Sequence, residues 1–199
     1  MKTRHAGFTL LELLTTIAVL AVIVAIGVPN FRDFVRNSRM TAAANDIVTD
    51  FNLARSEAIK RGVPVTLCKS QDGATCDADA ADPFVNWIVF VDDADPAVAD
   101  ALDGNGEADP DEPVLRQRSI SETLTVYTNA DARLAIFQRD GFPRSTAAGN
   151  VTDFRLCDDR KNEIGVGGRS AARAIRVLPT GRPVVTREIA TIEALGGCP

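Results

Sequence analysis

The chain has 199 residues, of which 45% are hydrophobic, and a formal net charge of −5. This length allows one apolar anchor and one domain of roughly 140 residues that buries its own core. Since the only histidine is His5, composition excludes a Ser-His-Asp or Cys-His catalytic set in any domain formed by later residues. The net charge predicts no partner, because an acidic stretch (92–112, nine acids and no base) is followed by a basic region (113–199, thirteen Lys and Arg against nine acids).

The first seven residues have the composition of a leader with an unusual order. Lys2 and Arg4 precede the small pair Ala6-Gly7, and an apolar run begins at Phe8. A secretory signal peptide has its small-residue cleavage site after the apolar run, not before it. A cut after Gly7 would therefore leave the apolar run on the mature protein.

The apolar run, residues 8–28, is long enough to span a bilayer, since 21 helical residues extend about 30 Å. Lys2 and Arg4 favour a cytoplasmic N-terminus. Arginines on the far side of the run weaken the argument for this orientation. The four cysteines that follow support it again, because cysteine pairs are typical of an oxidising compartment. We predict a single-pass protein with its larger part on the exported side.

Glu12 is the one acid inside this run. A carboxylate at that depth costs about 2.5–3.5 kcal/mol on insertion scales, so we expect it to have a partner or a task. No base lies within a helical turn or two of it on the mature chain. The α-amine that cleavage would create at Phe8 of a neighbouring subunit is the partner we predict. The alternative is an acid near enough to the interface to reach water.

The sequence Gly7-Phe8-Thr9-Leu10-Leu11-Glu12-Leu13-Leu14 resembles the type IV prepilin signature. The resemblance implies that prepilin peptidase cuts between Gly7 and Phe8, that the new N-terminal Phe8 is methylated, and that Glu12 is needed for assembly. It also implies a subunit of the cell inner membrane that joins other pilin or pseudopilin subunits through its N-terminal helix.

A continuous helix is predicted beyond the membrane span. Pro29 favours a kink and not a stop, and Gly62 with Pro64 ends the helix near Arg61. We divide the chain into a leader (1–7), a transmembrane and filament-core helix (8–29), an amphipathic second half of the helix (30–62) and a β-rich periplasmic head (63–199). Apolar residues spaced three or four positions apart form a stripe along one face of this helix. They are Phe31, Phe34, Val35, Ala44, Ile47, Val48, Phe51, Ala54, Ala58 and Ile59.

Short runs rich in β-branched and aromatic residues, separated by glycine turns, predict strands in the head. They are 63–68, 87–91, 114–118, 124–127, 134–137, 153–157, 174–178 and 183–186. The predicted fold is therefore α+β, a long helix packed on a mostly antiparallel sheet.

Four segments resemble the GspH/FimT branch of the pilin superfamily: 54–68, Trp87 to Asp92, Cys157-Asp158-Asp159-Arg160 and Thr180-Gly181-Arg182. The resemblance implies a minor pilin of the type IV pilus or the minor pseudopilin H of type II secretion. Both initiate or cap a filament, and the sequence leaves the choice open. No GxSxG, Walker-type or GxGxxG motif occurs, so we predict no enzymatic activity.

Four cysteines, Cys68, Cys76, Cys157 and Cys198, follow the apolar run. Their even number predicts two disulfides, and three pairings are possible. We favour Cys68–Cys76 as a local link and Cys157–Cys198 as a clasp on the C-terminal tail. Zinc is the alternative, but there is no CxxC pair.

Two charged regions are candidate binding sites. Calcium takes six to eight oxygen ligands, and Asp92, Asp93, Asp95, Asp103 and Glu107 could supply them, although the EF-hand spacing is absent. DNA phosphates could bind an arginine cluster in 169–187. FimT-like pilins implicated in DNA uptake have a Gly-Arg-x-Arg motif, of which Gly181-Arg182-Pro183-Val184 keeps the first arginine only. The alternatives are a solvated acidic loop and strand-face arginines that support packing. The cluster consists of Arg169, Arg173, Arg176, Arg182 and Arg187.

Overall fold

A computed structural model provides the coordinates of the chain. It describes residues 8–77, 85–92, 104, 106–121, 123–128, 134–144, 152–165 and 167–199. The chain forms two compact units, Met1–Ser38 and Arg39–Pro199. Below, the described part of the first unit (residues 8–38) is called the N-terminal segment, and the second unit is called the head.

Helix α1 (Leu10–Arg61) contains Pro29 in its interior, as the sequence predicts. It ends where the chain reaches Gly62, whose φ of +69° is a left-handed conformation that favours glycine. The Gly62 N–H donates to the carbonyl of Ala58 at 2.9 Å and closes the last turn. The predicted end of the helix is confirmed.

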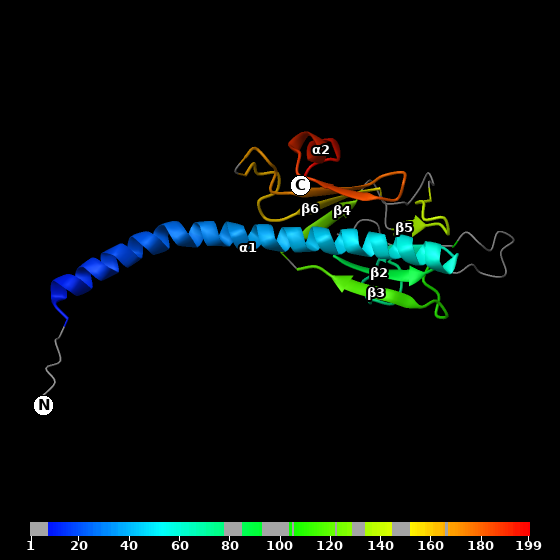
Figure 1. Cartoon of the computed structure of the whole chain (residues 1–199), viewed down its shortest axis with the longest axis horizontal. Coiled ribbons are helices and arrows are strands. Elements are labelled where there is room, and N and C mark those ends of the chain that lie inside the picture. The colour runs from blue at the N-terminus through cyan, green and yellow to red at the C-terminus, as the bar shows by residue number, and fades with distance from the viewer. Residues whose placement is uncertain are drawn as a thin grey trace, which may run out of the picture. The chain divides into compact units, whose positions relative to one another are not determined.

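Eight strands form two antiparallel sheets in the head, so the predicted α+β fold with antiparallel strands is confirmed (Figure 1). The first sheet has the order β3-β2-β1-β5 and the second has the order β4-β6-β7-β8. Their bounds are β1 (Val65–Lys69), β2 (Asn86–Val91), β3 (Val114–Ser119), β4 (Thr125–Thr128), β5 (Leu134–Phe137), β6 (Asp153–Cys157), β7 (Arg173–Val177) and β8 (Pro183–Thr186). Every predicted strand is present, with its bounds shifted by two residues at most.

The part of α1 that lies in the head packs against both sheets. Its buried face supplies Met40, Ile47, Phe51 and Ala54, among others, to one core cluster with strands of each sheet. The Phe51 ring meets Phe137 of β5 edge-on at 5.8 Å and Phe154 of β6 at 5.2 Å, so that one side chain joins helix and both sheets. The predicted apolar stripe is therefore buried at Ala44, Ile47, Phe51, Ala54 and Ala58.

Three members of the predicted stripe are exposed, and Val35 and Val48 are half-buried. Phe31 and Phe34, which belong to the N-terminal segment, are 66% and 68% exposed, and Ile59 in the last turn of α1 is 52% exposed. The sequence periodicity continues through these positions, but the core cluster begins only at Met40.

Asp50, which the sequence analysis missed, is a fully buried carboxylate on the apolar face of α1. It accepts hydrogen bonds from the indole N–H of Trp87 at 2.8 Å and from Nε of Arg118 at 3.2 Å. The Asp50 carboxylate holds the pKa of Arg118 above its ordinary value. The signal available in the sequence was an acid at a stripe position, between Ile47 and Phe51.

Both disulfides have the pairing favoured from the sequence. Cys68–Cys76 closes a short loop after β1 with a Cα separation of 5.6 Å, and Cys157–Cys198 ties the chain end to β6 with a Cα separation of 5.8 Å. A short helix that the sequence analysis did not predict, α2 (Ile189–Ala194), precedes Cys198 and packs Ile192 against Cys157 and Cys198.

Candidate functional site

The start of α1 is fixed by Thr9, directly after the predicted cleavage site. The Thr9 hydroxyl accepts the Glu12 backbone N–H at 3.2 Å, and the Thr9 carbonyl accepts the Leu13 N–H at 3.1 Å. Thr9 is therefore the N-cap, because its side chain satisfies one of the amides that every helix start leaves free. Gly7 lies outside the described residues.

The Glu12 carboxylate lies on the first turn of α1 and is exposed. Within the described residues it has no hydrogen bond or ion pair from its side chain, and it is the one charged residue in 8–31. A negative charge in the first helical turn interacts favourably with the helix dipole, but this is worth at most about 1 kcal/mol at an exposed site. The carboxylate is available to a group from outside the chain.

Residues 8–28 of the N-terminal segment present apolar side chains around the whole circumference of the helix. The large hydrophobic residues between Phe8 and Ile26 are 49–76% exposed. By length and composition, this stretch makes α1 a helix that could cross a membrane. Surface of this kind requires an apolar environment, either lipid or other helices.

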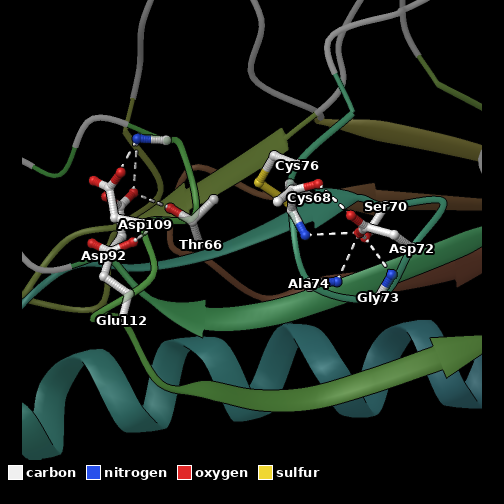
Figure 2. Close-up of a disulfide and its surroundings, with 12 residues drawn as sticks. Thr66, Cys68, Ser70, Asp72, Gly73, Ala74, Cys76, Asp92, Asp109 and Glu112 are labelled. Carbon is white, nitrogen blue, oxygen red and sulfur yellow. Dashed lines mark hydrogen bonds between the residues drawn. A yellow bond between two sulfur atoms is a disulfide. The ribbon is translucent and has the colours of Figure 1, made fainter.

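Asp92, the first of the predicted calcium ligands, holds a loop instead. Its carboxylate is fully buried and accepts the Thr66 hydroxyl and the Gly106 N–H, the latter at 3.0 Å (Figure 2). Gly104 packs so closely on it that a Cβ there would lie 2.6 Å from Asp92 Cγ. Asp92 thus closes the chain back onto β1.

The other calcium candidates are not gathered in the described part of the chain. Glu107 is exposed there, and Asp93, Asp95 and Asp103 lie outside it. Among the described residues no group of three Asp, Glu, His or Cys could hold a metal ion. The calcium hypothesis gains no support from the structure.

Three of the five predicted DNA-binding arginines line one cleft of about 450 Å³. Arg173 starts β7, Arg187 follows β8, and the pairing of Ala174 with Thr186 sets the two residues opposite each other in the hairpin. Arg169 completes the set. Gly168, Val185, Thr186 and Glu188 form the rest of the lining.

The other two arginines lie elsewhere. Arg176 forms an ion pair with Asp153 at 2.7 Å. Arg182 is exposed in the turn between β7 and β8, at the opposite end of the hairpin from the cleft, because Val177 pairs with Pro183. The run of arginines in the sequence is therefore one compact cluster of three and two separate side chains.

Comparison with known proteins identifies the family. The model of the prokaryotic N-terminal methylation motif matches residues 2–28, and the model of the type II transport protein GspH matches residues 43–181. The chain belongs to the GspH family. Proteins of this pilin and pseudopilin class are structural subunits, so the chain is not an enzyme.

The GspH-family chain also resembles two solved structures of the type IV minor pilin FimU from Pseudomonas aeruginosa. One shares 16% identity, with 79% of this chain and 94% of the other covered and a TM-score of 0.48. The second crystal form shares 17% identity, with 73% and 90% covered and a TM-score of 0.46. No curated protein matches the chain.

The two family models divide the GspH-family chain much as its structure does. The methylation motif ends at Val28, inside the N-terminal segment, and the GspH match begins at Ala43, inside the head. The predicted assembly residues Phe8 and Glu12 belong to the N-terminal segment, and the arginine cleft belongs to the head, where β7, β8 and the residues beside them line it.

Proposed function

We propose that this pilin-like subunit is a minor component that initiates or caps a filament, in type IV pilus biogenesis or in type II protein secretion. The observation that supports this most is the stretch 8–31: an exposed apolar helix whose one acid, Glu12, has no partner among the described residues. The family description, a type II transport protein, favours the secretion role. Loss of secretion or loss of pili in a strain without the gene distinguishes the two.

Processing follows from the position of the apolar helix. Prepilin peptidase cuts between Gly7 and Phe8, and the new Phe8 amine is methylated. Residues 8–29 remain as a single-pass anchor in the inner membrane, with the N-terminus cytoplasmic and the head periplasmic. Thr9 supports this arrangement, since it caps α1 with groups that stay on the mature chain after the cut.

Glu12 would then pair with the Phe8 amine of a neighbouring subunit. An unpaired carboxylate in hydrocarbon costs about 2.5–3.5 kcal/mol, and an intermolecular ion pair recovers part of this only when the helices are in register. The same cost that opposes insertion of a single subunit therefore favours an ordered bundle.

The test compares Glu12→Gln with Glu12→Asp in the full-length chain. We expect Glu12→Gln to leave membrane insertion and cleavage intact and to reduce incorporation into filaments at least tenfold, because the charge is lost but the shape is kept. Glu12→Asp keeps the charge and should retain part of the activity. Incorporation is measured by immunoblotting of sheared filaments or by secretion of a reporter substrate.

Intact-mass spectrometry of the membrane-extracted protein supplies the control. A mature chain starting at methylated Phe8 is expected in all three proteins. Normal incorporation of Glu12→Gln would contradict the pairing, and a chain that still starts at Met1 would contradict the processing.

A further inference from the structure

The arginine cleft is held in shape by the backbone of the segment 170–172. Arg173 is 5% exposed, and its Nη1 donates to the carbonyls of Ala171 and Ala172 at 2.7 and 3.2 Å. Arg187 donates through Nε and Nη2 to the carbonyl of Ser170 at 3.1 and 3.0 Å. Two guanidinium groups are thus fixed in place before any ligand arrives, which lowers the entropy cost of binding.

The cleft concentrates positive charge that the protein offsets only in part, through the charge of Asp158 near Arg173. Burial, followed by the repulsion of Arg187 and Arg160, lowers the pKa of Arg173 to about 10, and burial with the charge of Arg169 lowers the pKa of Arg187. Both remain charged at neutral pH. In the described part of the chain no carboxylate forms an ion pair with Arg169, Arg173 or Arg187, and Glu188 accepts a hydrogen bond from Thr191. An oxyanion from outside would offset this repulsion.

The size and lining favour a protein carboxylate over a nucleic-acid backbone. A strand of nucleic acid needs a row of phosphate contacts, whereas Arg176 is paired with Asp153 and Arg182 lies at the other end of the hairpin. Next to the arginines, Val184 and Val185 of the edge strand β8 are 45% and 41% exposed. A peptide offers an acid and apolar side chains together, and a free sheet edge can accept an extended segment.

We propose that the Arg169–Arg173–Arg187 cleft binds a side-chain carboxylate from an acidic segment of a neighbouring protein subunit. The proposal rests on the proposed function, which places other subunits beside the head. Arg173 and Arg187 hold the carboxylate oxygens through their fixed guanidinium groups. Arg169, which is exposed and whose side chain has no partner among the described residues, closes over it.

The experiment uses the full-length processed chain in detergent micelles and fluorescence anisotropy at low salt. The probes are fluorescein-labelled hexaglutamate, hexaglutamine and a 20-nucleotide oligothymidylate. We expect hexaglutamate to bind, hexaglutamine not to bind, and added salt to weaken binding. Arg169→Gln is the test variant, because it removes a cleft charge without removing a backbone hydrogen bond. It should lower hexaglutamate affinity at least fivefold.

Arg182→Gln is the matched control, since it removes the same charge from an exposed site outside the cleft. It should change the affinity less than twofold. Equal losses in the two variants would show diffuse attraction and overturn the proposal. So would oligothymidylate binding that depends on Arg169 without hexaglutamate binding. Either failure is separable from the proposed function, which the Glu12 variants test through filament incorporation.

Discussion

The N-terminal segment and the head use apolar residues in opposite ways, although one helix contributes to both. In residues 8–28 the large hydrophobic side chains are exposed, whereas Met40, Ile47 and Phe51 of α1 are buried against two sheets in the head. Two acids on α1, Asp50 in the head and Glu12 in the N-terminal segment, differ in the same way. Asp50 receives hydrogen bonds from Trp87 and Arg118, whereas the Glu12 side chain has no bond within the described residues.

The difference shows which part of the chain is complete by itself. In the head, the buried acid of α1 is paired and the apolar face of α1 is covered by the two sheets, so the stability of this part depends on contacts within the chain. In the N-terminal segment, the Glu12 charge has no partner among the described residues and the apolar side chains are exposed. The stability of this segment therefore depends on lipid or on other subunits. Substitutions on the same helix should therefore fall into two classes, one that changes folding and one that changes assembly.

The largest effect should come from Phe51→Ala. Removing a fully buried ring that contacts Phe137 and Phe154 leaves a cavity and should lower the free energy of unfolding by about 3–5 kcal/mol. Trp87, the only tryptophan and buried in the head, reports unfolding of the full-length chain in denaturant. Phe34→Ala is the matched control in the N-terminal segment, and it should change this value by no more than about 0.5 kcal/mol. Similar losses of unfolding free energy in the two variants would contradict the difference between the head and the N-terminal segment.

A smaller effect is expected from Asp50→Asn. The substitution removes the charge that Arg118 pairs with in the core and should destabilise the head by about 3 kcal/mol. Asp46→Asn breaks a contact of 3.1 Å with the same Arg118, but the Asp46 side chain is 39% exposed, so its loss should cost about 1 kcal/mol or less. The measurement is again denaturant unfolding followed by Trp87 fluorescence. Equal losses would mean that burial does not set the strength of these pairs.

Much of the fold could be predicted from the sequence because its signals are local. The predicted runs at 134–137, 153–157 and 183–186 match β5, β6 and β8 residue for residue, and Gly141 and Gly181 mark turns beside two of them. The division into two sheets could not be predicted, because the partners of β1 are β2 and the distant β5. Helix α2 was missed because six residues give too short a pattern, although Gly196-Gly197 marks its end.

The candidate site shows the same limit. Glu12 stands out in the sequence because an acid in an apolar run conflicts with its surroundings. The arginine cleft depends on register, since only the pairing of β7 with β8 brings Arg173 beside Arg187 and separates both from Arg182. A count of charges along the chain does not contain that information.

The smallest effect we consider tests whether the two sheets of the head act as one unit. Gly181, in the β7–β8 turn of the second sheet, has φ +77°, and a Cβ there would lie 2.7 Å from the carbonyl oxygen of Gly141, after β5 of the first sheet. Gly167 has φ +84° with nothing within 4 Å of such a Cβ. Gly167→Ala should therefore cost only the backbone strain, about 1 kcal/mol, and Gly181→Ala about 2 kcal/mol because the contact must also open. Both are measured by Trp87 fluorescence, which reports the first sheet. If Gly181→Ala lowers the free energy of unfolding no more than Gly167→Ala does, the β7–β8 turn can move and the two sheets are not coupled there. A larger loss of stability, with normal membrane insertion, would show that the coupling is present and that its effect is confined to the head.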